Sequence, residues 1–252
     1  MQKKCKCKIK LYRLEIKRNI VSLIFMPFFS KIIAIIGEIV YNERMEMGTK
    51  NSKGVCRIIC AGERSELNFD PKPEDLTIAA DGGYDYAVEA GIVPDIVLGD
   101  FDSVKREINS DAIRLNPVKD VTDTFAAVET GLGKGYKFFE MYCCTGGRTS
   151  HTLANIATLR YIASRGGSGV MKGKDCEIYL CDRRAEINGN VYFSLIPSGD
   201  LAEVEIENAA YSGTFLLTDK DSLGVSNEPL KNKTAAVTVH SGEVVVIIEQ
   251  KN

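Results

Sequence analysis

The chain has 252 residues, enough for a sizeable core in one or two domains, and its 44% hydrophobic and 26% charged residues are typical of globular proteins. Residues 1–18 contain eight Lys or Arg against one acid, so residues 19–252 carry a formal net charge of −9 within a total of −2. This acidic body argues against a nucleic-acid-binding surface as the main function.

The eight cysteines show no paired spacing of the kind that zinc sites use. Several of them lie inside hydrophobic, strand-like runs. Cys143 and Cys144 are adjacent and would point to opposite faces of a strand, which disfavours a bridge between them. We therefore expect buried free thiols and a cytoplasmic protein.

Residues 1–53 form an N-terminal extension that is first basic and then apolar, as in a signal peptide or membrane anchor. Lys31 divides the apolar run into pieces too short to span a bilayer, and Pro27 would kink a helix there. A membrane partner is therefore not expected unless residues 1–40 are a genuine anchor.

Two other interpretations of this extension remain open. It is either a loosely ordered segment, or a stretch upstream of a true start at Met45 or Met47. A start at Met47 would place a polar lead-in before the first strand.

Strand-like and helical patterns alternate along residues 54–184. This alternation predicts βαβ units and a largely parallel, Rossmann-like sheet in an α/β domain. In such sheets, ligands bind beyond the carboxyl ends of the strands. The strand-like runs are 55–61, 76–80, 94–98, 138–144 and 177–181, and the helical segments are 84–90, 124–132 and 149–164.

Residues 185–252 have a different rhythm, in which turn residues separate short strand-like runs. Val204 and Ile206 alternate with Glu203, Glu205 and Glu207, so this strand would have one buried face and one solvent-exposed face. The pattern predicts an antiparallel β-sandwich domain over residues 185–252. Its expected strands are 191–196, 202–206, 213–217, 234–239 and 243–248.

Four short acidic or glycine-rich motifs lie within residues 80–151. They are Ala80–Gly83, Gly99–Ser103, Lys119–Asp123 and Gly146–His151. Carboxylates at strand ends can hold a metal ion, and glycine loops before helices can bind phosphates. Each motif alone is more simply a helix cap or a turn, but together they predict a site for Mg²⁺ and a polyphosphate.

The aspartates of these motifs have the spacing of metal ligands. Asp100 and Asp102 would project from one face of an extended segment and share a cation. Asp120 and Asp123 would lie on one side of a first helical turn or tight loop. Four carboxylates near one point would repel each other strongly without a cation.

The segment Gly146–Arg148 precedes a predicted helix. Backbone N–H groups exposed by Gly146 and Gly147 would bind phosphate oxygens, and Arg148 would add a bidentate contact. The spacing is not that of a Walker A loop. We expect His151 to serve in helix-start packing rather than as a metal ligand.

The order of these motifs, followed by Ser222–Glu228 near the end of the chain, resembles thiamine pyrophosphokinase of the bacterial type. The resemblance covers about residues 55–250. It implies an α/β nucleotide-binding domain followed by a β-sandwich, assembled as a homodimer with active sites between subunits. It also implies transfer of a diphosphate from ATP to the hydroxyl of thiamine, with release of AMP.

The resemblance assigns roles to individual residues. Asp100, Asp102 and Asp123 would hold Mg²⁺, and Asp120 or Asp123 would orient the thiamine hydroxyl or accept its proton. The residues expected to engage ATP or shape its site are Asp81, Gly82, Gly83, Gly146, Gly147, Arg148 and Ser150. The residues expected to seat thiamine are Ser222, Ser226 and Asn227.

One position departs from the family pattern. The family loop reads Gly-Gly-Arg-x-Asp-His, and Ser150 stands here in place of the aspartate. Serine keeps a capping oxygen but loses a negative charge. Two alternatives to an active enzyme therefore remain open: a catalytically impaired thiamine or nucleotide binder, and a diphosphokinase for another hydroxyalkyl heterocycle.

Overall fold

The computed structural model describes residues 53–101, 113–114 and 121–251. The N-terminal extension before residue 53 lies outside these ranges, as do the predicted site residues Asp102 and Asp120. In the described ranges, the helices are all too short or too polar to cross a bilayer.

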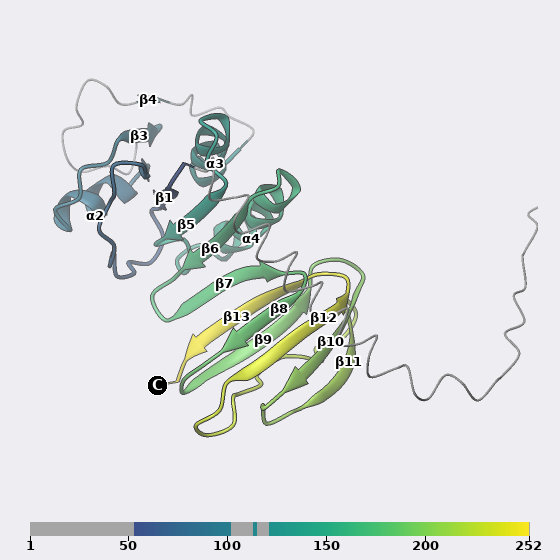
Figure 1. Cartoon of the computed structure of the whole chain (residues 1–252). Helices are drawn as coiled ribbons and strands as arrows, with labels where there is room; N and C mark the ends of the chain where they lie inside the picture. The colour runs from purple at the N-terminus through teal and green to yellow at the C-terminus, as the bar shows by residue number, and fades with distance from the viewer. Residues whose placement is uncertain (1–52, 102–112, 115–120, 252) are drawn as a thin grey trace, which may run out of the picture. The chain divides into compact units, whose positions relative to one another are not determined.

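A nine-stranded sheet, in the order β4-β3-β2-β1-β5-β6-β7-β13-β9, runs through the described chain (Figure 1). Strands β1 to β6 pair in parallel with one another, and the β6–β7, β7–β13 and β13–β9 pairs are antiparallel. The strands are β1 (Val55–Ile59), β2 (Leu76–Ala80), β3 (Ile96–Gly99), β4 (Ile113–Arg114), β5 (Phe138–Tyr142), β6 (Ser168–Lys172), β7 (Cys176–Cys181), β9 (Val191–Pro197) and β13 (Val244–Gln250).

The three predicted helices are present, as α2 (Gly83–Glu89), α3 (Asp123–Gly133) and α4 (Thr149–Ser164). Helix α3 begins at a side-chain cap, where the Thr122 hydroxyl accepts a hydrogen bond from the Phe125 backbone N–H. Helices α3 and α4 pack on each other through the rings of Phe125 and Tyr161, whose centroids are 4.6 Å apart. Together they cover a core that includes Ile58, Ile78, Phe139, Met141 and Met171.

A four-stranded antiparallel sheet, in the order β11-β10-β12-β8, follows in the C-terminal part. Its strands are β8 (Arg184–Ile187), β10 (Leu201–Glu207), β11 (Gly213–Thr218) and β12 (Ala235–Ser241). Val204 and Ile206 of β10 are buried, as their alternation with glutamates predicted. They share a second core with Phe193 and Val246 of the large sheet, so the predicted α/β fold with a β-sandwich is confirmed.

The large sheet continues across residue 184, where the sequence predicted a domain boundary. Strand β13 pairs with β7 on one side and with β9 on the other. The sandwich is therefore formed by the antiparallel end of the large sheet and the four-stranded sheet packed on it.

Two strands of the large sheet were not predicted, β4 with two residues and β6 with the sequence Ser-Gly-Val-Met-Lys. Strand β6 has little intrinsic strand preference at its start, because it begins with serine and glycine. Its place between β5 and β7 supplies hydrogen-bond partners on both edges.

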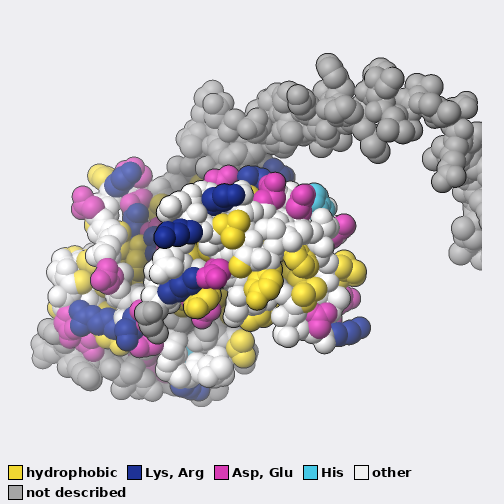
Figure 2. Space-filling view, turned by 90° about the horizontal axis from the view of Figure 1, so that it is seen from below, with side chains coloured by type: hydrophobic (Ala, Val, Ile, Leu, Met, Phe, Trp, Pro, Cys, Tyr) yellow, Lys and Arg dark blue, Asp and Glu magenta, His cyan; other side chains and the backbone are white. Residues whose placement is uncertain are grey.

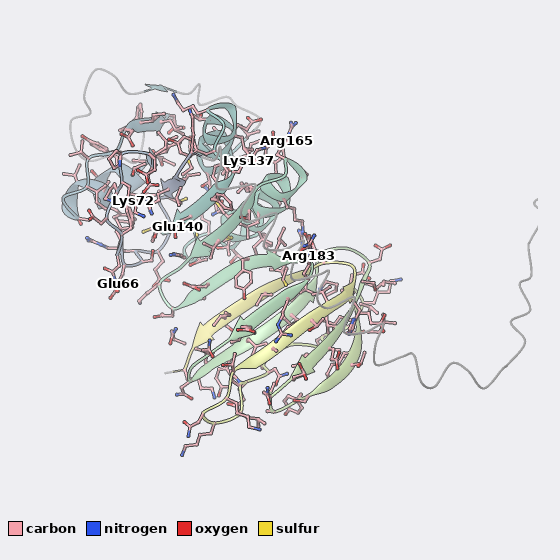
Figure 3. All side chains as sticks on the ribbon, viewed as in Figure 1. Glu66, Lys72, Lys137, Glu140, Arg165 and Arg183 are labelled. Carbon is pink, nitrogen blue, oxygen red and sulfur yellow. The ribbon has the colours of Figure 1, made fainter. Side chains whose placement is uncertain are left out.

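A network of charged side chains crosses β1, β5 and β6 on the face opposite the α3–α4 core, and Figure 3 labels its central carboxylate, Glu140 of β5. Arg57 Nε lies 2.9 Å from Glu140 Oε2, and Lys172 Nζ lies 2.9 Å from Glu140 Oε1. The Arg57 guanidinium also pairs with Asp75 and stacks over the Phe69 ring, 4.9 Å from its centroid. The segment between β1 and β2 is thereby fixed across this face of the sheet.

We expect Asp75→Asn to lower the free energy of unfolding by about 3 kcal/mol, because it leaves the charge of buried Arg57 with Glu140 alone. Burial would raise the pKa of the Asp75 carboxyl, but hydrogen bonds from Arg57 and from backbone N–H groups hold it below its ordinary value. This contribution is therefore complete above the ordinary aspartate pKa and is lost as pH falls through the lower folded value.

Urea denaturation at neutral and acidic pH measures this effect. Asp70→Asn is the matched control, because Asp70 is exposed in the same segment. Equal stabilities of the two variants at neutral pH would contradict a structural role for the network.

Candidate functional site

The carboxyl ends of β3, β2, β1 and β5 lie next to one another along one edge of the large sheet. After β1 the chain continues to β2, which lies on one side of β1 in the sheet. Strand β5 lies on the other side of β1 and continues through α4 to β6, farther from β1. The connections that leave β1 and β5 therefore run in opposite directions along the sheet. Such a topological switch point is where open α/β sheets bind ligands.

The backbone turns that carry Asp81 and Asp100 are held together at this edge. The Asp81 backbone N–H donates to the Leu98 carbonyl over 2.8 Å, and its φ of 51° turns the chain sharply at the end of β2. A Cβ at Gly99 would lie 3.0 Å from Asp81 Cα, so only glycine lets the end of β3 approach so closely. The residue that follows Gly99 is Asp100, which is half-buried.

The glycines of the first motif have a packing role. Gly82 occupies the N-cap of α2, and Gly83 is the first helical residue. A Cβ at Gly83 would lie 2.0 Å from the Ile59 carbonyl oxygen. The absence of a side chain therefore lets α2 start directly against the end of β1.

Asp123 lies in the first turn of α3, where the positive end of the helix dipole favours a carboxylate. The next residue, Thr124, is buried, and its hydroxyl lies 3.4 Å from Cys60 Sγ at the end of β1. The start of α3 is therefore fixed at the same sheet edge as Asp81 and Asp100.

Burial raises the pKa of Cys60 to about 12, against an opposing hydrogen bond from Thr124. Nearby Cys143 and Asp123 raise it further. The Cys60 thiol is therefore protonated at neutral pH and is a packing group rather than a nucleophile or metal ligand.

The proposed metal ligands are only partly within the described chain. Asp100 and Asp123 lie at the shared edge, whereas Asp102 and Asp120 fall outside the described ranges. Across the ranges that are described, no three His, Cys, Asp or Glu side chains come together as a metal site. The ligand set Asp100, Asp102 and Asp123 therefore stays a prediction.

The glycine loop between β5 and α4 turns through two residues of positive φ. Gly146 and Gly147 have φ values of 72° and 59°, a region that favours glycine. Arg148 is the N-cap of α4, its side chain makes no capping hydrogen bond, and it is exposed. Ser150 and His151 are exposed in the first turn of the helix.

The loops after β1 and β5 are joined beyond the strands themselves. Gly62 and Glu63 donate backbone hydrogen bonds of 2.8 Å to the carbonyls of Cys143 and Thr145. Glu63 lies against Gly146, where an added Cβ would be 2.5 Å from Glu63 Cβ. Its carboxylate pairs with Lys174 Nζ at 3.1 Å.

The roles of Glu63 and Lys174 beside the glycine loop were not predicted. Glu63 follows Gly62 after a strand, and that glycine marked only a loop. Nothing in the spacing of Lys174 pointed to the site, because it comes from the hairpin between β6 and β7.

Ser222, Ser226 and Asn227 follow β11 in the sandwich part. Ser222 and Ser226 are exposed, and Ser226 has a φ of 60°. Asn227 is only 3% exposed. Its amide Nδ2 donates a hydrogen bond of 2.8 Å to the Tyr211 carbonyl, and its Oδ1 accepts one of 3.0 Å from the Tyr211 backbone N–H. The Asn227 side chain therefore braces a turn, while the two serines present their hydroxyls at the surface.

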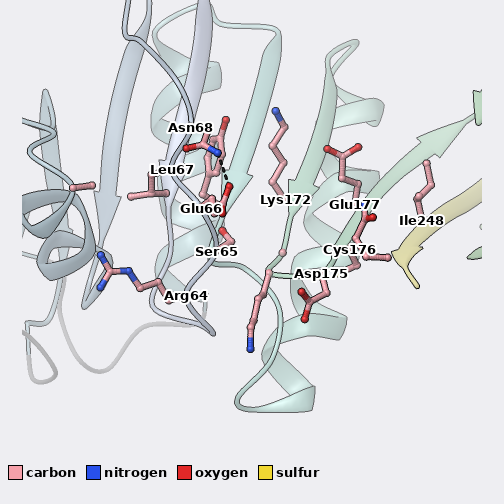
Figure 4. Close-up of a pocket in the computed structure, with 15 residues that line it drawn as sticks. Arg64, Ser65, Glu66, Leu67, Asn68, Lys172, Asp175, Cys176, Glu177 and Ile248 are labelled. Atoms are coloured by element: carbon pink, nitrogen blue, oxygen red, sulfur yellow. Dashed lines mark hydrogen bonds between the residues drawn. The ribbon is translucent and has the colours of Figure 1, made fainter. Parts of the chain in front are cut away.

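A groove of about 1190 Å³ lies between the loop after β1, the hairpin between β6 and β7, and the end of β13 (Figure 4). Sequence reasoning did not predict it. Its lining mixes charged, amide and apolar side chains and includes Leu67, Asn68, Lys172, Lys174, Glu177 and Ile248.

The chain is similar in sequence and in fold to known thiamine pyrophosphokinases. Residues 71–168 match the family described as the catalytic domain of thiamin pyrophosphokinase. The thiamine pyrophosphokinase of Bacillus subtilis (strain 168) is 36% identical over 91 residues, which cover 33% of this chain and 42% of the relative. The match thus spans less than half the length of that relative.

Solved structures extend the likeness to the sandwich. The thiamine pyrophosphokinase of Bacillus subtilis has a TM-score of 0.69 at 24% identity, covering 79% of this chain and all of that one. That of Geobacillus thermodenitrificans has a TM-score of 0.67 at 20% identity, covering 79% and 99%. The Candida albicans protein has a TM-score of 0.62 at 14% identity, covering 79% and 90%.

These structures agree with the described chain in fold, and the family match covers the motifs at the edge of the large sheet. The resemblance to bacterial thiamine pyrophosphokinase is thereby confirmed, since residues 71–168 are similar to the catalytic domain of that family.

Proposed function

We propose that this protein is a thiamine diphosphokinase that transfers a diphosphate from ATP to the hydroxyl of thiamine and releases AMP. The observation that supports this most is the convergence of Asp81, Asp100, Asp123 and the glycine loop on the switch point between β1 and β5. Carboxylates and a phosphate-binding turn at one edge suit transfer of a charged group between two bound substrates.

The expected chemistry assigns one task to each group. Arg148 and the N–H groups of Gly146 and Gly147 bind the phosphate oxygens of ATP. They hold the triphosphate so that the thiamine hydroxyl can attack in line with the bond that breaks. The thiamine hydroxyl oxygen forms a bond to the β-phosphorus as the bond to the α,β-bridging oxygen breaks, and AMP leaves with that oxygen. Asp123 or Asp120 accepts the hydroxyl proton.

A divalent cation fits the donor types at this edge, because Mg²⁺ prefers carboxylate oxygens completed by water and phosphates. Asp100 and Asp123, together with Asp102, would hold it. When bound, it would neutralise charge on the transferred phosphates. A cationic thiazolium ring would also be favoured near these carboxylates.

Incubating the full chain with thiamine, ATP and Mg²⁺, and measuring AMP and thiamine diphosphate, tests the proposal. Formation of both products supports it. Thiamine or nucleotide binding without AMP would instead identify an impaired binder, the alternative that Ser150 favours. AMP released only with another hydroxyalkyl heterocycle would assign a different acceptor.

We expect Ser150→Asp to raise kcat about tenfold or more, because it restores a carboxylate in the first turn of α4 beside the phosphate site. Ser150 is exposed, so the change should not disturb the core. Steady-state kinetics with Ser150→Asn as the control separates charge from size. An unchanged or lower kcat for Ser150→Asp would show that the serine is not a handicap.

We also propose a homodimer with active sites between subunits. One face of the described chain shows hydrophobic side chains among charged ones (Figure 2). In the sandwich part, Ile196, Leu216, Leu223 and Val225 are 42–57% exposed. Exposed apolar side chains of this kind suit an interface with a second copy, and sedimentation velocity would measure the oligomeric state.

A further inference from the structure

Asn155 is a polar side chain buried within α4, and it reaches out of the helix to the end of β5. It is 5% exposed, and its Nδ2 donates a hydrogen bond of 2.7 Å to the Cys144 carbonyl oxygen. We infer that Asn155 is a positioning residue, which acts through this carbonyl to set the conformation of the glycine loop. The inference rests on the proposed function, in which residues 146–148 hold the phosphates.

Three consecutive carbonyl groups ahead of the glycine loop accept hydrogen bonds from other parts of the fold. Those of Cys143 and Thr145 accept from backbone N–H groups in the loop after β1, each over 2.8 Å. The carbonyl of Cys144, between them, accepts from Asn155. In a planar trans peptide, the carbonyl and the following N–H point in opposite directions. A fixed Cys144 carbonyl therefore fixes the Thr145 N–H, and a fixed Thr145 carbonyl fixes the N–H of Gly146.

The Asn155 hydrogen bond also joins the two ends of the loop. The loop begins after β5 and ends at Arg148, the N-cap of α4. Apolar side chains such as Leu159 and Ile162 pack α4 on the sheet, but apolar attraction has no preferred direction. A directed hydrogen bond from α4 to the Cys144 carbonyl fixes where the helix starts relative to the strand, and with it the position of Arg148.

Loss of this donor should disturb the loop rather than unfold the domain. Cys144 is only 2% exposed, so its carbonyl would have to turn toward another partner if Asn155 could not donate. The peptide plane between Cys144 and Thr145 would turn with it. Contacts to phosphate should therefore weaken, whereas thiamine contacts in the sandwich part should not.

Titration calorimetry of the full chain with inorganic tripolyphosphate tests the inference. Asn155→Leu keeps a γ-branched side chain without the donor and should weaken tripolyphosphate binding about tenfold. Asn155→Ala, which adds no volume, should have a similar effect. In steady-state kinetics both variants should raise the KM for ATP about tenfold and leave the KM for thiamine within about twofold.

Thr158→Val is the matched control, and its tripolyphosphate affinity should stay within about twofold of the parent. Thr158 is buried in the next turn of α4, and its hydroxyl donates within the helix, to the Ala154 carbonyl over 2.9 Å. The control therefore loses a buried hydrogen bond of the same helix without touching the loop. An equal loss of affinity in Thr158→Val would overturn the inference, as would near-parental affinity in both Asn155 variants.

A double-mutant cycle with Arg148→Ala separates positioning of the loop from a general effect on the helix. Because Asn155 acts through the loop that carries Arg148, the combined loss in kcat/KM for ATP should be smaller than the product of the single losses. Losses that multiply would count against the inference. The proposed function is judged separately, by product formation in the parent. Tripolyphosphate binding that depends on Asn155, in a parent that forms no thiamine diphosphate, would contradict only the proposed function.

Discussion

Asp123→Asn is expected to reduce kcat about 10³-fold while leaving the fold intact, because it removes one carboxylate from the edge where the transferred charge must be stabilised. The Thr122 cap of α3 does not depend on the Asp123 side chain. Asparagine has nearly the same size, so the effect comes from the lost charge rather than from lost packing.

Steady-state kinetics and thermal denaturation measured together check this result. Glu129→Gln, an exposed carboxylate on the same helix, is the control and should stay within about twofold of the parent. An Asp123→Asn protein with near-parental kcat would remove Asp123 from the catalytic set. Titrating Mg²⁺ with both proteins then shows whether the lost carboxylate belonged to the cation site.

Arg148→Ala should lower kcat/KM for ATP by about 10²-fold, because the guanidinium makes charge-assisted hydrogen bonds to phosphate beside the glycine loop. Arg148 is exposed and its side chain does not cap α4, so stability should change little. The kcat/KM of Arg148→Lys for ATP should lie between those of the parent and Arg148→Ala, since lysine keeps the charge but cannot make the bidentate contact of a guanidinium.

The control for Arg148 is Arg165→Ala, at the opposite end of α4, where the guanidinium lies over the Tyr161 ring and donates a hydrogen bond to its hydroxyl. Initial rates at varied ATP and at varied thiamine separate the two substrates. A selective rise in the KM for thiamine would contradict phosphate binding by Arg148. Equal losses in Arg148→Ala and Arg165→Ala would point to a general effect on the helix.

Much of the fold was predictable because its local patterns are unambiguous. Helix α4 and strand β2 have the ranges that the sequence predicted, Thr149–Ser164 and Leu76–Ala80. The alternation of Val204 and Ile206 with glutamates correctly identified the buried face of β10. Hydrophobic periodicity of this kind indicates which side chains are buried on folding, and it can be read from a short stretch of sequence.

Strand β6 and the pairing of β13 with β7 were not predictable in the same way. A segment that begins Ser-Gly becomes a strand because β5 and β7 offer hydrogen bonds on both sides. Likewise, β13 joins the large sheet although it follows the sandwich strands along the chain. Pairing between segments far apart in sequence depends on which edges remain available after folding.

The sequence by itself determined which residues are proposed to bear the chemistry: the aspartates at strand ends and the glycine pair before α4, in an order of motifs that resembles thiamine pyrophosphokinase. Only the tertiary structure decided that Glu63 and Lys174 border the glycine loop, that the Asn227 amide is used to brace Tyr211, and that a groove opens beside the loop. Side-chain type and spacing are properties of the chain, whereas a shared wall or an occupied amide exists only once distant segments have packed.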